Sequence, residues 1–239
     1  EIDTLLRDRG KPVSCLSRHI FAGLTVANAP GDEAHTKHMD ALKRVIDMAH
    51  VLASPLVRIM TNKKEQILFG HNGAEKWNVA HGAWDKTLEL IAPAVDVARD
   101  AGIRLVVETG NGTMVNSCWT GRKLIDDLDA EDVLQVLWDP ANNCWCHERA
   151  WPDGYDALHG GYCVHIHIKD VEVDTPRATL TVKPLGEGQL ADQFEPMADA
   201  LREDSYDGVI SLESVFHPGN GDFEAGFRMC VDRFKAIFG

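Results

Sequence analysis

Short apolar runs alternate with longer stretches of helical periodicity along this chain. Residues 103–108 and 133–139 are nearly continuous apolar runs, the pattern of strands that are buried on both faces. Between such runs, apolar residues recur at helical spacing. In the segment from about 32 to 53 these positions are Met39, Leu42, Val45, Ile46, Ala49 and Leu52. The alternation of strand and helix predicts parallel strands in an α/β sheet or barrel.

The same patterns give bounds for the individual elements. Strands are predicted at residues 13–17, 56–60, 103–108, 133–139, 163–169 and 209–213. Helices are predicted at about residues 32–53, 84–101, 121–128, 191–202 and 223–238. Gly102 is expected to cap the second of these helices. Residues 61–78 are predicted to form a long loop, and residues 171–190 a long excursion with a small hairpin near 178–183.

Six predicted strands are two fewer than an eight-stranded α/β barrel needs. The length of 239 residues fits one such barrel, for which about 250 residues is typical. We therefore expect residues 1–239 to form a single (β/α)8 TIM-barrel domain that lacks the first strand, the first helix and most of the second strand. On this view Glu1 and Ile2 end a strand, and residues 3–9 form the next helix. An open barrel exposes apolar edges, and a homodimer that covers them is compatible with this view.

Composition and charge narrow the classes of partner. The apolar fraction of 44% and the charged fraction of 26% are ordinary for a soluble globular protein. A net charge of −13 disfavours nucleic acid as a ligand, because a polyanion is repelled unless a basic patch compensates. The six cysteines include no C-x-x-C pair, and neither a signal peptide nor a membrane-spanning run is recognisable. These features predict a cytoplasmic protein with reduced thiols and no membrane partner.

Candidate metal ligands stand at the ends of four successive apolar strands, at Glu108, Asp139, His167 and Glu213. A lone Glu at a strand end is most often a solvated loop residue, and an Asp before a Pro is often a turn starter. Four in consecutive strands of a parallel barrel would instead surround one point. Three carboxylates and one imidazole suit Mn²⁺, Mg²⁺ or Co²⁺, with Zn²⁺ and Fe²⁺ as alternatives.

Three runs of sequence extend this pattern to a known family. They are Val164-His165-Ile166-His167-Ile168-Lys169-Asp170, Gly186-Glu187-Gly188, and Tyr206-Asp207-Gly208 followed by an apolar strand that ends at Glu213. Over about residues 100–239 the chain resembles the sugar phosphate isomerase/epimerase family of xylose isomerase-like TIM barrels. The resemblance implies that Glu108, Asp139, His167 and Glu213 are the metal ligands, on barrel strands five to eight.

The resemblance also implies a function. It is a metal-dependent sugar isomerase or epimerase that moves a proton next to a carbonyl through a metal-stabilised enediolate, with a small sugar or polyol as substrate. In the ketose 3-epimerase branch the residues matching Glu108 and Glu213 form the proton-transfer pair. We expect substrate contacts from five further residues, namely Arg58, Asn142, His165, Lys169 and Glu187.

The chain departs from the tagatose- and psicose-type epimerases at three substrate-shell positions. It has Asn142 where they have His, Met114 where they have Glu, and Val173 where they have Arg. Other chemistries of the superfamily therefore stay open. The main alternative is a dehydratase of a cyclic polyol ketone, of the inosose or dehydroshikimate type. An AP-endonuclease-like phosphodiesterase and an inactive family member are the others.

Overall fold

The computed structural model describes residues 2–64, 82–213 and 215–239. The chain divides into two compact units. The first unit comprises residues 1–116 and 120–135, and the second comprises residues 117–119 and 136–239. Most of the predicted loop at 61–78 lies outside the described residues. That residues 1–239 form a single domain stays a prediction.

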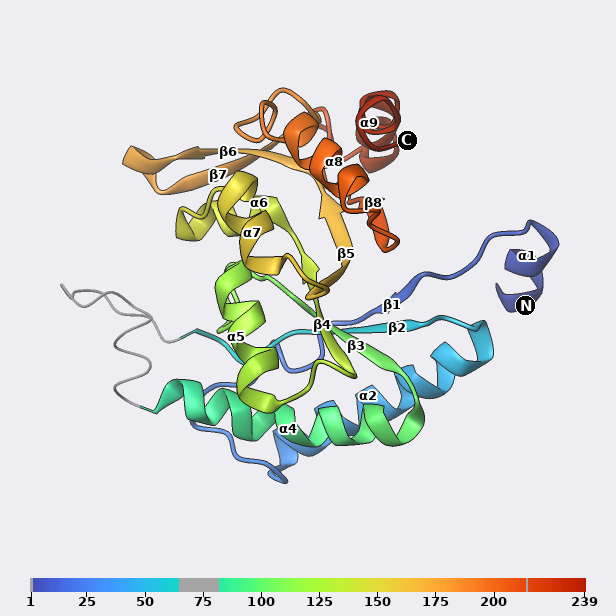
Figure 1. Cartoon of the computed structure of the whole chain (residues 1–239), viewed down its shortest axis with the longest axis vertical. Helices are drawn as coiled ribbons and strands as arrows, with labels where there is room; N and C mark the ends of the chain where they lie inside the picture. The colour runs from blue at the N-terminus through green and yellow to red at the C-terminus, as the bar shows by residue number, and fades with distance from the viewer. Residues whose placement is uncertain (1, 65–81, 214) are drawn as a thin grey trace. The chain divides into compact units, whose positions relative to one another are not determined.

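The strands form one parallel sheet and one hairpin (Figure 1). Their bounds are β1 Cys15–Ser17, β2 Leu56–Ile59, β3 Arg104–Glu108, β4 Leu134–Trp138, β5 Cys163–Ile168, β6 Asp170–Asp174, β7 Thr179–Lys183 and β8 Val209–Leu212. The sheet order is β1-β2-β3-β4-β5-β8. Parallel pairing joins β1 to β2, β2 to β3, β4 to β5 and β5 to β8. The predicted α/β fold with parallel strands is confirmed.

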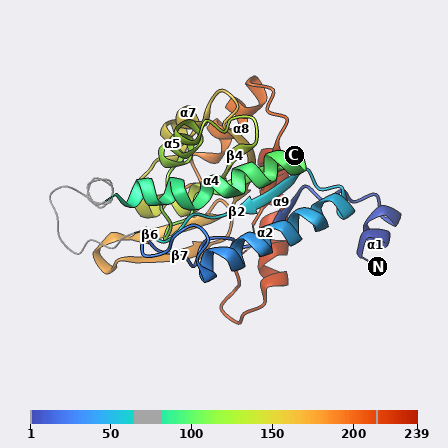
Figure 2. The same ribbon diagram turned by 90° about the horizontal axis from the view of Figure 1, so that it is seen from below.

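In the first unit, two long helices cover the sheet. The helices of this part of the chain are α1 Ile2–Asp8, α2 Glu33–Leu52, α4 Ala83–Ala101 and α5 Cys118–Leu128, the last of which begins in residues of the second unit. Helices α2 and α4 lie side by side and pack on β2 and β3 (Figure 1, Figure 2). Leu42 of α2 and Ile91 of α4 are fully buried, and every residue of β2 is buried. This burial explains the apolar spacing of the helices and the continuous apolar strands.

Local capping sets the ends of these helices. Asp32 precedes α2, and its side chain accepts a hydrogen bond of 2.7 Å from the His35 backbone N–H. This bond, helped by others, lowers the pKa of Asp32 to about 2. Helix α4 ends at Gly102, which has a left-handed φ of 63° and donates its N–H to the last turn, as predicted.

In the second unit, short helices follow β4 and longer ones flank β8. The α-helices are α6 Pro140–Asn143, α7 Tyr155–Leu158, α8 Phe194–Glu203 and α9 Phe223–Phe238. Single turns of 3₁₀ or π type occupy Cys144–Cys146, Ala150–Gly154 and Thr175–Arg177. Helix α9 packs against both α8 and β8. The sequence pattern missed the turns between β4 and β5, because none is long enough to show helical periodicity.

The hairpin β6–β7 is longer than the small hairpin predicted near 178–183. Strand β6 begins at Asp170, only two residues after β5 ends at Ile168. The sequence pattern therefore did not separate the start of β6 from the end of β5. The buried Asp170 carboxylate accepts backbone N–H bonds from Gly186, Gly188 and Leu190, at 3.0, 2.9 and 3.1 Å. A side chain on Gly188 would collide with Asp170. One carboxylate therefore fixes the loop that carries Glu187.

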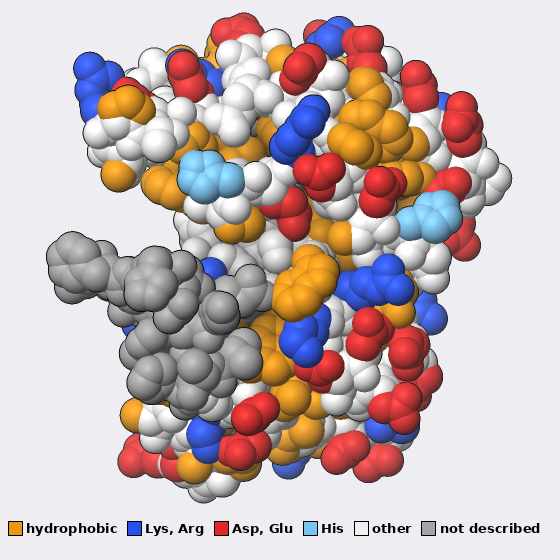
Figure 3. All heavy atoms as spheres, turned by 60° about the vertical axis from the view of Figure 1, so that its left-hand side comes forward, with side chains coloured by type: hydrophobic (Ala, Val, Ile, Leu, Met, Phe, Trp, Pro, Cys, Tyr) orange, Lys and Arg blue, Asp and Glu red, His pale blue; other side chains and the backbone are white. Residues whose placement is uncertain are grey.

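Carboxylates and cations are interspersed on the molecular face in Figure 3, in keeping with the acidic composition. No helix in the described residues is long and apolar enough to cross a bilayer.

We expect Ile91→Ala to lower the free energy of unfolding by about 2–5 kcal/mol, because it deletes fully buried atoms in α4. The matched control is Val51→Ala in α2, where the side chain is 62% exposed and a change within about 0.5 kcal/mol is expected. Urea unfolding followed by circular dichroism measures both. Equal losses in the two variants would contradict the assignment of the core.

We expect Asp170→Asn to destabilise the loop of residues 184–190, because an amide can turn a donor toward three backbone N–H groups that need an acceptor. The loss is about 2–3 kcal/mol, since the lost bonds are charge-assisted. Proteolysis within this loop should become faster. The control is Asp174→Asn, because the Asp174 carboxylate bonds locally to the backbone N–H and the exposed side chain of Arg177 at the hairpin tip. Equal protease resistance in both variants would argue against this role of Asp170.

Candidate metal centre

Three neighbouring strands of the second unit end in side chains that can bind a metal. Asp139 directly follows β4, His167 is the penultimate residue of β5, and Glu213 directly follows β8. Strand β5 pairs in parallel with both β4 and β8. Parallel strands end at the same edge of a sheet, so the topology brings the three side chains together.

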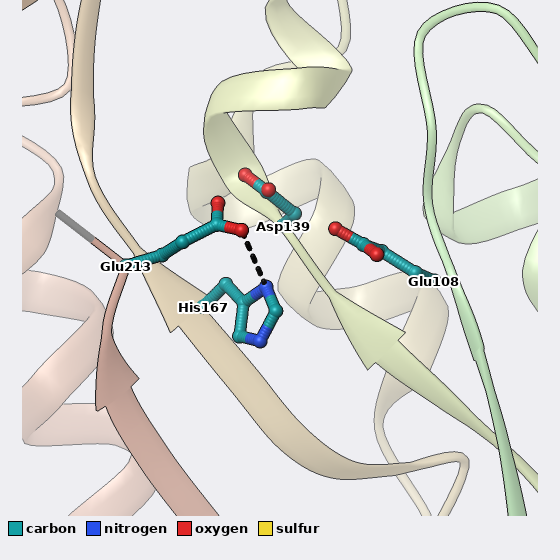
Figure 4. Close-up of side chains that lie close together, drawn as sticks. All are labelled: Glu108, Asp139, His167 and Glu213. Atoms are coloured by element: carbon teal, nitrogen blue, oxygen red, sulfur yellow. Dashed lines mark ion pairs between the residues drawn. The ribbon is translucent and has the colours of Figure 1, made fainter. Parts of the chain in front are cut away.

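The ligand atoms of Asp139, His167 and Glu213 converge (Figure 4). Each residue offers one such atom, and these atoms lie within 4.8 Å of one another. His167 Nδ1 is 3.6 Å from Glu213 Oε1. The side chain of Asp139 is fully buried, whereas those of His167 and Glu213 are 12% and 30% exposed. Glu213 is therefore the member of this group that small molecules reach most easily.

The short helix α6 fixes Asp139. Pro140 occupies the first turn of this helix, and Asp139 is its N-cap residue. Asp139 Oδ1 accepts a bond of 3.1 Å from the backbone N–H of Asn142. Asp139 before Pro140 thus starts a helix, and the same Asp also faces His167 and Glu213. Asn142 serves this cap through its backbone, and its role as a substrate contact stays a prediction.

Lys169 connects two of the three candidate ligands. Its Nζ donates to Asp139 Oδ2 and to Glu213 Oε2, and its side chain is only 12% exposed. Burial by itself would lower the pKa of Lys169, but the two carboxylates outweigh that effect and raise it. The ammonium group therefore stays charged and offsets the negative charge of the carboxylates.

His165 and His167 point to the same side of β5 but have different neighbours. The two rings meet edge to face, with their centroids 5.2 Å apart. His165 is buried, and its Nε2 lies 2.9 Å from Ser211 Oγ on β8. His167 instead faces Glu213. This geometry favours His167 over His165 as a metal ligand, and it adds Ser211, which sequence reasoning missed. Ser211 shares its face of β8 with Glu213, and that period-two relation was a usable signal.

Glu108 and Arg58 form a buried ion pair within the first unit. Glu108 ends β3, and Arg58 lies on the adjacent strand β2. Arg58 Nη1 donates to Glu108 Oε2, and both side chains are about nine-tenths buried or more, at 6% and 5% exposure. Arg58 Nη2 also lies 3.4 Å from His19 Nδ1. Arg58 was predicted to contact substrate, and the structure gives it Glu108 as a partner.

Glu187 is exposed and lies between Gly186 and Gly188, on the loop that Asp170 holds. Its backbone N–H bonds to Pro184 O at 3.0 Å. Substrate contacts by Glu187 stay a prediction, as do those of Arg58, His165 and Lys169. Asp170 itself was quoted in the sequence motif without a role. The nearby Gly186-Glu187-Gly188 segment was a usable signal for a role of Asp170, because its backbone N–H groups need an acceptor.

The donor set fits a hard divalent cation. Two carboxylates and an imidazole at strand ends are ligands that Mn²⁺, Mg²⁺, Co²⁺, Fe²⁺ and Zn²⁺ accept. The Lys169 ammonium between Asp139 and Glu213 demonstrates that this place accommodates positive charge. The six cysteines are free thiols and none belongs to this group.

Solved structures with the same fold include enzymes of more than one kind. An L-ribulose 3-epimerase matches with a TM-score of 0.71 and 16% identity, over 99% of this chain and 78% of that one. The IOLI protein with a bound zinc atom matches with a TM-score of 0.71 and 15% identity, over 100% and 81%. The probable 3-DHS dehydratase AsbF from Bacillus anthracis matches with a TM-score of 0.66 and 15% identity, over 97% and 81%.

No curated protein matches the chain significantly by sequence. The family model described as a xylose isomerase-like TIM barrel matches residues 1–232, nearly the whole chain. The sequence-based expectation of this barrel family is thereby confirmed, and the parallel strand order agrees with it. The chain belongs to the xylose isomerase-like TIM barrel family.

Proposed function

We propose that this protein is a metal-dependent sugar isomerase or epimerase, with a small sugar or polyol as its substrate. The observation that carries the proposal is the convergence of Asp139, His167 and Glu213 around a place that already holds a cationic nitrogen. The L-ribulose 3-epimerase among the similar folds supports the reaction class, and the zinc-bound IOLI protein supports the metal.

In this proposal Glu108 is the fourth ligand of the cation, together with Asp139, His167 and Glu213, because it too ends a strand of the parallel sheet. A divalent cation held by these residues would polarise a carbonyl and would stabilise the negative charge that develops when a neighbouring C–H loses its proton. Mn²⁺, Mg²⁺ and Co²⁺ are our first candidates, with Zn²⁺ and Fe²⁺ as alternatives.

Glu108 and Glu213 are the proposed proton-transfer pair. A carboxylate can take a proton from the carbon next to the carbonyl, and a second carboxylic acid can return one. Arg58 holds the Glu108 carboxylate through the buried ion pair and so fixes the direction in which its second oxygen points. Glu213 is the more exposed of the two, which leaves it accessible to substrate. Asp139 and His167 are proposed to hold the cation without moving a proton.

Five residues complete the proposed site through contacts with substrate oxygens, namely Arg58, Asn142, His165, Lys169 and Glu187. Lys169 and His165 lie beside candidate ligands, at 12% side-chain exposure and 4% residue exposure respectively. Because the chain differs from the tagatose- and psicose-type epimerases at Asn142, Met114 and Val173, we do not assign a ketohexose as the substrate. Cytoplasmic localisation and a homodimer stay predictions.

A dehydratase acting on a cyclic polyol ketone is the second candidate. The AsbF protein, a probable dehydratase, has the same fold, which favours this reading. The first step is shared, because loss of the proton next to the carbonyl precedes both proton return and loss of a β-hydroxyl. The residues that hand the proton back, or protonate a leaving hydroxyl, decide between the two reactions.

We expect purified protein to bind about one divalent cation per chain, as measured by elemental analysis. At 100 times its Kd, a cation that binds only the folded protein adds about 2.7 kcal/mol to the free energy of unfolding. MnCl₂ should therefore raise the Tm of chelator-treated protein. His167→Gln should lose this response, while His159→Gln, a distant exposed histidine paired with Asp204, should keep it. A rise in Tm that is equal in all three proteins would contradict the assigned ligands.

We expect Glu108→Gln to lower the rate of deuterium uptake from D₂O into a substrate ketose by about 10²- to 10⁴-fold, because an amide cannot accept the proton. Mass spectrometry or NMR over a panel of ketoses and cyclic polyol ketones measures the exchange. The control is Glu172→Gln, because Glu172 pairs with Lys183 in the exposed hairpin.

The same panel separates the two reaction classes. Deuterium uptake without loss of water supports the isomerase or epimerase, whereas a rising enone absorbance supports the dehydratase. If metal-bound protein gives no deuterium uptake and no enone absorbance with any compound of the panel, both proposed activities are contradicted. Uptake that is unchanged in Glu108→Gln would overturn the assigned role of Glu108.

A further inference from the structure

Lys169 lies at the point where two candidate metal ligands meet. It follows β5 by one residue and is two residues after His167, so it emerges on the same side of the strand. Its Nζ bonds to one oxygen of Asp139 and one of Glu213. A single ammonium group thus joins the end of β4 to the end of β8.

Further contacts of these carboxylates indicate which of their oxygens face Lys169. Asp139 Oδ1 accepts the Asn142 backbone N–H at 3.1 Å, and Oδ2 is the oxygen that Lys169 contacts. Glu213 Oε1 faces His167 Nδ1 at 3.6 Å, and Oε2 is the oxygen that Lys169 contacts. Asp139 Oδ2 and Glu213 Oε2 therefore both point at the ammonium group of Lys169.

We propose that Lys169 is a built-in competitor of the metal: it neutralises Asp139 and Glu213 until a divalent cation binds, and the cation then displaces it. The inference rests on the proposed metal site. A fully buried carboxylate such as Asp139 is strongly disfavoured without a positive partner, and Lys169 supplies one. A divalent cation and an ammonium group at the same two oxygens repel each other, so they compete for these oxygens.

Displacement gives Lys169 a second task. Its ammonium group has three N–H donors and a flexible stem, so it can turn to a substrate oxygen once the carboxylates are bound to metal. Metal binding and substrate binding are then coupled through one side chain. By linkage, a ligand that accepts a bond from the displaced Lys169 raises the affinity for the metal by the same factor by which the metal raises the affinity for that ligand.

The proposed competition predicts that Lys169→Met binds metal more tightly but is less stable without metal. Loss of the competitor should lower the Kd for Mn²⁺ by about tenfold or more, as measured by calorimetric titration of chelator-treated protein. Loss of the counter-charge should also lower the Tm of the same protein before Mn²⁺ is added. A side chain that only supports the fold would weaken both metal binding and stability.

The matched control is Lys183→Met. Lys183 also pairs with a carboxylate, Glu172, at 2.6 Å, but in the β6–β7 hairpin. Its removal should leave the Kd for Mn²⁺ unchanged. Lys169→Gln, which is neutral and more polar, provides a second variant whose Kd should fall in the same way, and circular dichroism confirms that each variant is folded.

The outcomes separate this inference from the metal site on which it rests. If the wild-type protein binds Mn²⁺ and both Lys169 variants bind it equally or more weakly, the competition is wrong and the metal site stands. If the wild-type protein binds no divalent cation, the metal site and the competition both fall. Tighter binding in both Lys169 variants, with Lys183→Met unchanged, supports the competition.

Discussion

The parallel sheet imposes the constraint on which the rest of this structure depends. Strands that are covered on both faces are mostly apolar, and the carboxyl ends of parallel strands all reach the same edge. Every residue of β4 is buried, and the first polar position after it is Asp139. Candidate metal ligands therefore gather where strands end, while polar residues within the strands, such as Arg58 and His165, are buried and paired with other side chains. Asp139, His167 and Glu213 follow this rule.

Placing carboxylates at buried strand ends creates a charge problem, and the chain solves it in three ways. Arg58 pairs with Glu108 on the neighbouring strand, Lys169 pairs with both Asp139 and Glu213, and backbone N–H groups surround Asp170. A guanidinium holds its partner in a fixed, planar geometry, whereas an ammonium on a flexible stem can leave. The difference explains why Arg58 fits a fixed positioning role and Lys169 an exchangeable one.

A barrel of this family does not by itself determine a reaction, because function depends on the groups around the site. Removal of a proton next to a carbonyl needs a base and a way to stabilise the charge that forms, and in the proposed function a carboxylate and a bound cation supply them. Isomerase, epimerase and dehydratase chemistry diverge only afterwards. The divergence is controlled by donors around the substrate, and the chain differs from one epimerase branch at these positions.

The sequence by itself determined the order of strands and helices and the identity of the strand-end residues. Apolar runs and helical spacing are local properties, so α9 matched its predicted bounds and the other long elements fell within a few residues of theirs. Short elements such as α6, and strand β6 directly after Lys169, escaped because they lack a full period. Only the tertiary structure decided the partners: that Arg58 holds Glu108, that His165 turns to Ser211, and that Lys169 bridges Asp139 and Glu213. Such contacts join residues about 30 to 50 positions apart, and no local pattern encodes which distant side chains will meet.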